Sequence, residues 1–447
     1  MSRPADAKLQ GWGRFGGAKT TLQRCASAAE AASRLASGPL IARGLGRSYG
    51  DSAVSAEQTL LTAGLNKFIA FDVHTGELVA EAGVSLADII ATCLPRGWFP
   101  RVTPGTKHVT LGGMLAADVH GKNHHVDGSM VDCVHWLDLL LPTGETVRCS
   151  HHENSTLFHD TVGGMGLTGI ILRASVALRA VETGWIRTRT VVAPHFRAAF
   201  DAFESNASAP YSVAWIDCVR SGNALGRSLV YFGEHAPLSA LSPAQQRDRY
   251  ALSPRWRLHV PVTPPVSLLN PLSIAAFNHL YFHRGKRDTA PRLAGWDAYF
   301  YPLDAVRGWN RLYGKQGFVQ FQAVLPLHMA ERGMAELLHT IAASRAASFL
   351  AVLKRMGHGR AEGIAFPMAG YTLALDFPAT PKTIALVARL HRLTQQHEGR
   401  VYLAKDALLT APELEAMDPR VAAFKARRRA SGGGAHFQSL QSERLSL

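Results

Sequence analysis

Cysteine is scarce in this chain, which has five cysteines among 447 residues. They are widely separated and include no C-x-x-C pair, so they support neither a disulfide framework nor a zinc knuckle. The sequence therefore excludes a small disulfide-bonded fold, and a reducing compartment is the simpler expectation. The five positions are Cys25, Cys93, Cys133, Cys149 and Cys218.

Long apolar runs are also absent. No stretch of about 18 apolar residues occurs, so we expect no transmembrane helix. The first residues, Met1-Ser2-Arg3-Pro4, lack the apolar core of a secretory signal. We therefore expect a cytoplasmic protein, or one that contacts a membrane only at its surface.

Acidic residues are few relative to basic ones. Lysine and arginine number 48 against 34 acidic residues, and the resulting net charge of +14 favours an anionic partner. Nucleic acid, an acidic membrane surface and a phosphorylated substrate all fit this charge. The one dense basic cluster is Lys425 with Arg427 to Arg429, and no nucleic-acid-binding motif accompanies it, so we expect no nucleic acid.

Local patterns predict an α+β protein. At 447 residues and 47% hydrophobic content, the chain is large enough for two domains. Strands are predicted over 78–82 and 170–181, a helix after Ser85, and a hairpin over 136–148. These elements alternate without an internal repeat.

Three later segments depart from this alternation. Residues 233–268 contain six prolines and are predicted to form a long irregular loop. The apolar residues 268–282 precede a basic run at 283–287, so this segment is either a core helix or a surface that rests on an anionic membrane. Residues 431–434 are expected to be a flexible break before a short terminal segment.

Glycine, in contrast, is concentrated at Arg43 to Asp51, which reads RGLGRSYGD. Glycine lets a chain approach a ligand closely, and successive N–H groups in such a turn bind anions. Arginine adds paired donors suited to phosphate. The spacing differs from the usual dinucleotide fingerprint, so the loop is either a cradle for a diphosphate or only a turn.

Further glycine-rich patches lie at 103–106, 110–113 and 161–169. So many patches exceed what turns alone usually require. A long, multiply charged cofactor such as FAD would explain them by touching several loops. The alternative is a β-rich domain with tight turns.

Polar residues are densest from Asp118 to His125, where three histidines fall within six residues. Gly121 interrupts any helix and no H-E-x-x-H pattern occurs, so we expect no metal. Histidines placed beside the ring of a cofactor fit better. Lys405 follows an apparent strand and has a role only if the fold turns it inward.

These residues together resemble one family over nearly the whole chain. It is the flavoprotein oxidase subunit of decaprenylphosphoryl-ribose 2′-epimerase, within the vanillyl-alcohol-oxidase (PCMH) type of FAD protein. The resemblance rests on the glycine loop and on five further blocks in the same order, the most specific being His120 to His125. The five blocks are 103–128, which contains His120 to His125, then 161–171, Trp309-Asn310-Arg311, Gln320 with Gln322, and 402–406.

The resemblance implies a split domain arrangement. Residues 1–184 would form a PCMH-type FAD-binding domain, and residues 400–447 would complete it. Residues 185–399 would form an inserted α+β substrate domain on an antiparallel sheet.

The resemblance also implies an activity. The family oxidises the 2′-hydroxyl of a polyprenylphosphoryl ribose to a ketone, and a separate NAD(P)H-dependent short-chain reductase completes epimerisation to arabinose for cell-wall arabinan. It further implies that peripheral contact with an anionic membrane and a periplasmic location are possible.

Site residues carry over by position. Lys405 would be the indispensable polar group, with His120 and Tyr49 as candidate bases. Residues facing the substrate would be Asn310, Gln320, Gln322 and Lys354. The FAD site would comprise Ala42, Arg43, Gly44, Leu45, Gly46, Arg47, Ser48, Tyr49, Gly50, Asp51, Ser52, Gly105, Thr110, Leu111, Gly112, Gly113, Ala117, Asp118, Val119, His120, Ile171 and Tyr402.

Three positions distinguish this chain from other proteins of the superfamily. Arg47 stands where many sugar oxidases of the superfamily carry a flavin-linked histidine, so non-covalent FAD is expected. Ala374 and Thr372 stand where mycobacterial members have cysteine and asparagine. Thiol-directed inhibitors should therefore react poorly, and the exact lipid sugar can differ.

Two other functions remain open from the residues. One is a stand-alone FAD sugar or aldonolactone oxidase that passes electrons to oxygen. The other is an idle flavoprotein or lipid-sugar binding module, against which the joint presence of His120, Lys405 and Tyr49 argues.

Overall fold

The glycine loop follows a small mixed sheet near the N-terminus. The computed structural model describes residues 5–253 and 257–447. In this sheet β1 pairs antiparallel with β2, and β2, β4 and β3 run parallel, so the loop leaves the carboxyl end of a parallel strand. Helix α1 (Ala28–Leu35) joins β2 to β3 and is capped by Ser27, which accepts the backbone N–H of Glu30. The strands are β1 (Ala5–Leu9), β2 (Ala18–Arg24), β3 (Ile41–Arg43) and β4 (Gln58–Leu61).

A second, antiparallel sheet completes this part of the molecule. Its order is β5-β6-β10-β8-β9, and β7 also pairs with β10. The strands predicted at 78–82 and 170–181, the hairpin over 136–148 and the helix start at Ser85 are confirmed. The strands are β5 (Phe68–Phe71), β6 (Glu77–Glu81), β7 (Trp98–Pro100), β8 (Val134–Leu140), β9 (Thr146–Ser150) and β10 (Ile170–Ala180), and the helices α2 (Leu86–Cys93), α3 (Leu111–Ala116), α4 (His124–Asp127) and α5 (Ser155–Thr161).

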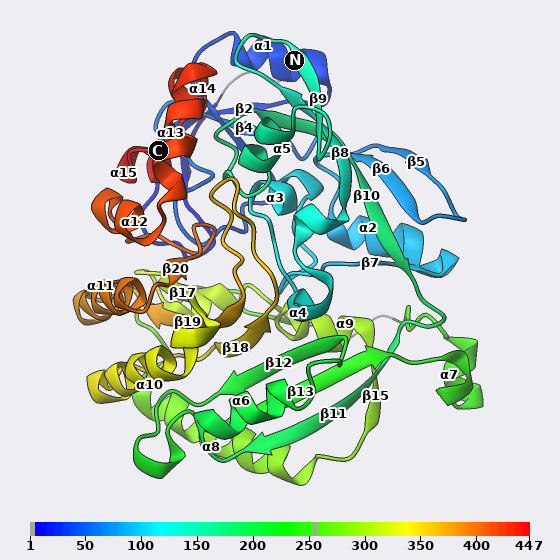
Figure 1. Ribbon diagram of the computed structural model, residues 1–447, viewed down its shortest axis with the longest axis vertical. Coiled ribbons are helices and arrows are strands. Elements are labelled where there is room, and N and C mark those ends of the chain that lie inside the picture. Colours follow the sequence, from blue (N-terminus) through cyan, green and yellow to red (C-terminus); the bar gives the residue numbers. More distant parts are fainter. Residues whose placement is uncertain (1–4, 254–256) are drawn as a thin grey trace.

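An eight-stranded antiparallel sheet forms the lower half of the molecule in Figure 1. Its order is β15-β11-β13-β12-β18-β19-β17-β20. Helices α6 (Phe196–Glu204), α10 (Leu327–Ser344) and α11 (Pro381–Gln396) bury one face of it in a shared apolar core. The strands are β11 (Trp185–Ala193), β12 (Tyr211–Ile216), β13 (Ser228–His235), β15 (Arg292–Gly295), β17 (Phe318–Pro326), β18 (Ala351–Met356), β19 (Gly370–Pro378) and β20 (Arg400–Val401).

The chain then returns to its beginning. Helices α12 (Ala411–Met417), α13 (Arg420–Ala430), α14 (Gly433–His436) and α15 (Leu440–Arg444) lie beside the N-terminal sheet (Figure 1). The backbone N–H of Leu40 donates to the carbonyl of His436 at 2.8 Å. The α+β class with antiparallel sheets is confirmed, whereas the boundaries at 184 and 399 stay predictions. Strand β20, just past the second boundary, pairs with β17.

The predicted flexible break at 431–434 is wrong. Part of it is α14, and the buried Arg428 holds the turn by donating to the main-chain oxygens of Leu167, Gly433 and Phe437. In the same basic cluster, Arg427 pairs with Asp160 and Lys425 with Glu415. Much of this charge is therefore structural.

The segment 268–287, for which a core helix and a membrane-facing surface were both open, contains α8 (Pro271–Arg287), which buries one side and exposes the other. Leu272 is 83% exposed and Leu280 is 70% exposed, while Ile274, Asn278 and Phe282 are buried. Within 233–268 the structure shows mostly irregular chain around α7 (Pro243–Arg247), with 254–256 outside the described residues. Strand β14 (Leu258–His259) pairs with β16 (Val306–Arg307), and α9 (Trp296–Phe300) follows β15. No helix among the described residues is long and apolar enough to cross a bilayer.

Candidate active site

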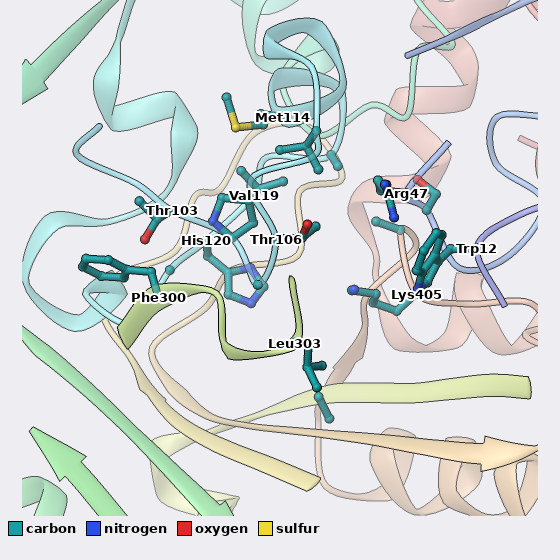
Figure 2. A pocket seen from close by; sticks show the side chains of 18 of the residues that line it. Trp12, Arg47, Thr103, Thr106, Met114, Val119, His120, Phe300, Leu303 and Lys405 are labelled. Atoms are coloured by element: carbon teal, nitrogen blue, oxygen red, sulfur yellow. The ribbon is translucent and has the colours of Figure 1, made fainter. Parts of the chain in front are cut away.

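A cavity of about 810 Å³ lies between the glycine loop, α3 and the second face of the eight-stranded sheet. The side chains that line it come from both halves of the molecule, as Figure 2 shows for Arg47, His120, Leu303 and Lys405. Its size is that of a site for a large ligand, since pockets for small molecules and cofactors span about 300–1,000 Å³.

The glycine loop is built for close approach. A Cβ on Gly44 would collide with the Thr110 hydroxyl, and Gly46 has φ +62°, a left-handed conformation that favours glycine. Thr110 in turn caps α3, because its hydroxyl accepts the N–H of Gly113 at 3.2 Å. Gly105 has no atom within 4 Å of an added Cβ and faces open space in the cavity wall.

Three buried polar atoms in this wall have no partner among the described residues. They are Ser52 Oγ, Thr103 Oγ1 and His120 Nδ1. Because a buried polar group without a hydrogen bond is costly, such atoms are typical of a ligand site. The glycine-lined wall and these three atoms fit FAD, which carries a diphosphate, hydroxyls and a ring with polar edges.

The eight-stranded sheet forms the opposite wall, because every second side chain along its strands points toward the face that bears the cavity. On β17, Gln320 and Gln322 face the cavity while Phe321 and Ala323 lie in the core behind it. On β18 and β19, Lys354 and Ala374 face the cavity in the same way. Three of the four predicted substrate-facing residues, Gln320, Gln322 and Lys354, are thus brought together.

His120 lies where the two walls meet. Its Nε2 is 3.2 Å from the amide nitrogen of Gln322, and its ring packs against Phe366 and Tyr402 at 5.4 and 5.2 Å between centroids. Burial first, and then the neighbouring Lys354, hold the pKa of His120 well below its usual value. The imidazole is therefore neutral.

Three lysines line the cavity. Lys405 Nζ lies 3.7 Å from the centre of the Tyr49 ring, and Lys122 Nζ lies 4.1 Å from that of Tyr299. Burial lowers the pKa of Lys405 and of Lys122 to about 7, and that of Lys354 to about 8. Each lysine thus gains or loses a proton near neutral pH.

Tyr49 behaves differently from Lys405, which it supports. Burial, followed by the field of Asp376, raises the pKa of the Tyr49 hydroxyl well above its usual value. Its ring packs edge-on against Phe318 at 5.4 Å. Tyr49 therefore stays protonated and serves as a platform.

Several predicted residues lie behind the cavity wall. Arg43 donates to the carbonyls of Gln10 and Ala53, and Asp51 pairs with Arg444. These contacts stiffen the glycine loop from outside. Leu111 lies in the core, Gly50 packs on the Asp406 carbonyl, and Asn310 donates to the Trp12 carbonyl at 3.1 Å.

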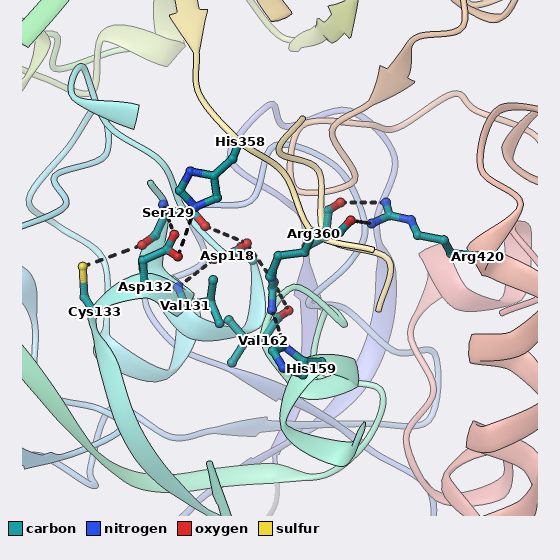
Figure 3. A network of polar contacts seen from close by, with 12 residues as sticks. Asp118, Ser129, Val131, Asp132, Cys133, His159, Val162, His358, Arg360 and Arg420 are labelled. Atoms are coloured by element: carbon teal, nitrogen blue, oxygen red, sulfur yellow. Dashed lines mark hydrogen bonds and ion pairs between the residues drawn. The ribbon is translucent and has the colours of Figure 1, made fainter. Parts of the chain in front are cut away.

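Asp118 is likewise not among the residues that line the cavity. Figure 3 shows its side chain within a network of polar contacts. Its carboxylate accepts from Ser129 Oγ, from the Val131 N–H and from Arg360, each at 2.9–3.0 Å. Arg360 belongs to the loop between β18 and β19, and Arg420 donates to its carbonyl at 2.9 Å. Asp118 thus anchors the segment that carries His120.

Some lining residues had not been assigned a role from the sequence. Lys122 lies within the histidine-rich segment from His120 to His125 and lines the cavity. The sequence placed it close to the site but could not show that its side chain points into the cavity. Arg47, which was expected in the FAD site, lies with its guanidinium 4.1 Å from the centre of the Trp12 ring and donates to the His108 carbonyl. Asp304, which accepts from Thr106, comes from a distant turn that carries no sequence signal. Among the described residues no group of histidine, cysteine or acidic side chains has the geometry to hold a metal ion.

Comparison with known proteins agrees with this geometry. Residues 20–150 match the family described as FAD binding domain. The chain is 34% identical to decaprenylphosphoryl-beta-D-ribose oxidase of Mycolicibacterium smegmatis, over 91% of this chain and 89% of that protein. It is 32% identical to an uncharacterized protein of Streptomyces coelicolor, over 81% of this chain and all of that protein. Cytokinin dehydrogenase 5 of Arabidopsis thaliana is 35% identical, but over only 26% of this chain and 21% of its own.

The fold and the cavity define an FAD-dependent oxidoreductase with a PCMH-type FAD-binding domain. Within that class, the chain belongs to the family of decaprenylphosphoryl-beta-D-ribose oxidase. The cytokinin dehydrogenases share only a part of the chain with it, so their likeness reaches no further than that part.

Proposed function

We propose that this protein oxidises the 2′-hydroxyl of a polyprenylphosphoryl ribose to a ketone. The observation that carries the proposal is the whole-length similarity to decaprenylphosphoryl-beta-D-ribose oxidase, which includes both walls of the cavity. Three lysines in that cavity also suit a substrate that carries a phosphate.

The glycine-rich wall would hold FAD without a covalent bond. Gly44, Gly46 and Gly105 line this wall without side chains, and Gly105 faces open space that the diphosphate would use. Ser52, Thr103 and His120 offer unpartnered polar atoms. Arg47 cannot form the histidine type of link. FAD held by these residues would supply the hydride acceptor for oxidation of the sugar carbon.

The protein's own task is to remove the hydroxyl proton. Of the two candidate bases expected from the sequence, Tyr49 stays protonated and His120 is a weak base, because its pKa is held well below its usual value. Lys405 has a pKa of about 7, lowered chiefly by burial, and a base is most effective when its pKa lies near the working pH. We therefore assign Lys405, in its neutral form, as the base.

The remaining groups would orient the sugar. Gln322 links His120 to the sheet, and Lys354, whose pKa is lowered by burial only to about 8, supplies positive charge for the substrate phosphate. A ketone released here needs reduction to complete an epimerisation, so the proposal includes a separate NAD(P)H-dependent reductase as partner.

A peripheral membrane contact is part of the same proposal. Helix α8 exposes Leu272 and Leu280 and ends in Arg284, Lys286 and Arg287. Tyr281 of this helix lines the cavity, so a lipid substrate would reach the site from the surface that α8 touches.

One experiment tests the function. The purified protein is acid-precipitated to see whether flavin stays in solution, and is mixed anaerobically with polyprenylphosphoryl ribose while the flavin absorbance is followed. Release of FAD, bleaching by the lipid sugar and a 2′-keto product are expected. Rapid peroxide formation with free sugars instead would identify a stand-alone oxidase, and flavin left in the pellet would contradict non-covalent binding.

A further inference from the structure

Asp376 is a buried acid that the mechanism above leaves unused. It lies on β19 directly opposite Gln320 of β17 and is fully buried. The side-chain amide of Gln320 donates to one carboxylate oxygen. The other oxygen has no partner, and no ion pair reaches Asp376 within residues 5–253 and 257–447.

The place of Asp376 relates it to the cavity. Asp376 lies two residues after Ala374 on β19, so its side chain points to the same face of the sheet, which is the face that bears the cavity. Gln320, its hydrogen-bond partner, lines the cavity, as do Tyr49 and Lys405. The carboxylate therefore lies one layer behind the group that we assign as base.

A proton transfer in this cavity creates an electrostatic problem. When the substrate O–H bond breaks and an N–H bond forms on Lys405, an ammonium ion appears in an enclosed site. Lys354, the neighbouring cation that acts on Lys405, opposes that charge. Asp376 is the acid whose field acts on Lys405 in the favourable sense.

We propose that Asp376 is a positioning residue that provides the countercharge for Lys405 when Lys405 takes the substrate proton. The proposal rests on the proposed function only for the source of that proton. Asp376 does not touch the substrate and acts across Gln320 and Tyr49.

The titration behaviour of the two groups agrees with this geometry. Burial raises the pKa of Asp376 to about 7, although the hydrogen bond from Gln320 and the charge of Lys405 both act to lower it. Burial lowers the pKa of Lys405 to about 7, with Asp376 raising it and Lys354 lowering it. Among the described residues, the other titratable groups that act on the pair or feel its charge are Lys354, His120, Tyr49 and Tyr313. The fields of Asp376 and Tyr49 raise the pKa of Tyr313 further, after burial, which is the larger cause.

The test replaces Asp376 by asparagine, which keeps the shape and the contact with Gln320. In the FAD-loaded protein without substrate, trace acetylation with acetic anhydride over a pH series, read by mass spectrometry, gives the pKa of Lys405. Loss of the carboxylate should lower that pKa by about 1 unit. Asp217→Asn, which disturbs a buried ion pair with Arg227 elsewhere, is the matched control and should leave it unchanged.

Flavin reduction by the lipid sugar gives a second measurement. The neutral amine is the base, so the rate rises with pH through the pKa of Lys405, and in Asp376→Asn this rise should move to lower pH. The plateau rate should fall about tenfold, because a weaker base transfers the proton less readily. Should Asp376→Asn fail to fold, Asp376→Ser takes its place.

The outcomes separate the two proposals. An unchanged acetylation pKa of Lys405 in a folded variant overturns the role of Asp376, whatever the substrate. A lowered acetylation pKa in a protein that the lipid sugar does not reduce supports the role of Asp376 and contradicts the proposed function instead.

Discussion

At the scale of single residues, the central prediction concerns the charge of Lys405. Lys405→Met and Lys405→Arg should both reduce flavin reduction by about 10³-fold, since neither methionine nor arginine can accept the proton. Rapid anaerobic mixing measures the rate. Lys382→Met, at an exposed position on α11, is the control and should behave as the unaltered protein.

The arginine variant decides between two roles. If Lys405 acted as a fixed cation that stabilises negative charge, Lys405→Arg would keep much of the rate while Lys405→Met lost it. Equal loss with FAD retained supports the base, and a rate preserved in Lys405→Arg would contradict it.

Sequence reasoning reached most of the cavity at this scale but not the direction of each side chain. It named Lys405, His120, Gln322 and Lys354, which the structure brings to one cavity. It could not separate Arg43 and Asp51, which brace the glycine loop, from Gly44 and Gly46, which face the cavity. That distinction depends on partners distant in the chain, such as Arg444.

At the scale of elements, the loop between β18 and β19 connects the two walls of the site. Arg360 pairs with Asp118 at 2.9 Å, and Phe366 of the same loop packs on His120. Arg360→Met should leave the buried carboxylate without a cation and destabilise the fold by about 3–5 kcal/mol. Denaturant unfolding measures this loss.

A second substitution isolates the pair. Asp118→Asn in the Arg360→Met background should recover part of the stability, because no charge then stays buried alone. Arg187→Met, which breaks an exposed pair with Glu234, should cost at most about 1 kcal/mol. Equal losses for the exposed and the buried pair would contradict the prediction.

The C-terminal turn gives a stability prediction of its own. Arg428→Met removes the donor that four main-chain oxygens share, including that of Leu447, and should cost about 3 kcal/mol. Thermal unfolding measures this loss, and Arg429→Met, a change at the adjacent exposed residue, should leave the stability unchanged. A neutral Arg428→Met would mean that water replaces the lost donor.

The elements that could be predicted from the sequence were those whose ends are determined by residues close by in the chain. The helix after Ser85 begins with a side-chain cap, and the hairpin over 136–148 contains Pro142 and Gly144. The order at 431–434 was not predictable, because a glycine-rich segment is held there by one buried arginine. The exposure of α8 likewise depends on what the tertiary structure leaves uncovered.

At the scale of the whole molecule, α8 predicts how the protein meets a membrane. The protein should sediment with vesicles of phosphatidylglycerol and phosphatidylcholine, and less with phosphatidylcholine alone. The double substitution Leu272→Ser and Leu280→Ser should weaken vesicle binding about tenfold by removing apolar contact. Binding of the unaltered protein to the anionic vesicles should fall as salt is added, and this fall should disappear when Arg284, Lys286 and Arg287 are replaced by glutamine.

A matched substitution elsewhere on the surface controls for nonspecific binding of exposed apolar side chains to the vesicles. Ile69→Ser alters an exposed apolar residue on the edge strand β5, in the other half of the molecule, and should leave vesicle binding unchanged. If Ile69→Ser reduces binding as much as the α8 changes do, the contact is not made by α8.

The cavity is walled by segments from near both ends of the chain and by the sheet between them, from Trp12 to Lys405. A ligand that fills it therefore joins segments that no local structure joins, and its binding energy becomes part of the cohesion of the entire fold. Free FAD at a hundred times its dissociation constant would add about 2.7 kcal/mol to the stability of the molecule. In such an arrangement the supply of cofactor governs how long the protein persists as well as how fast it works.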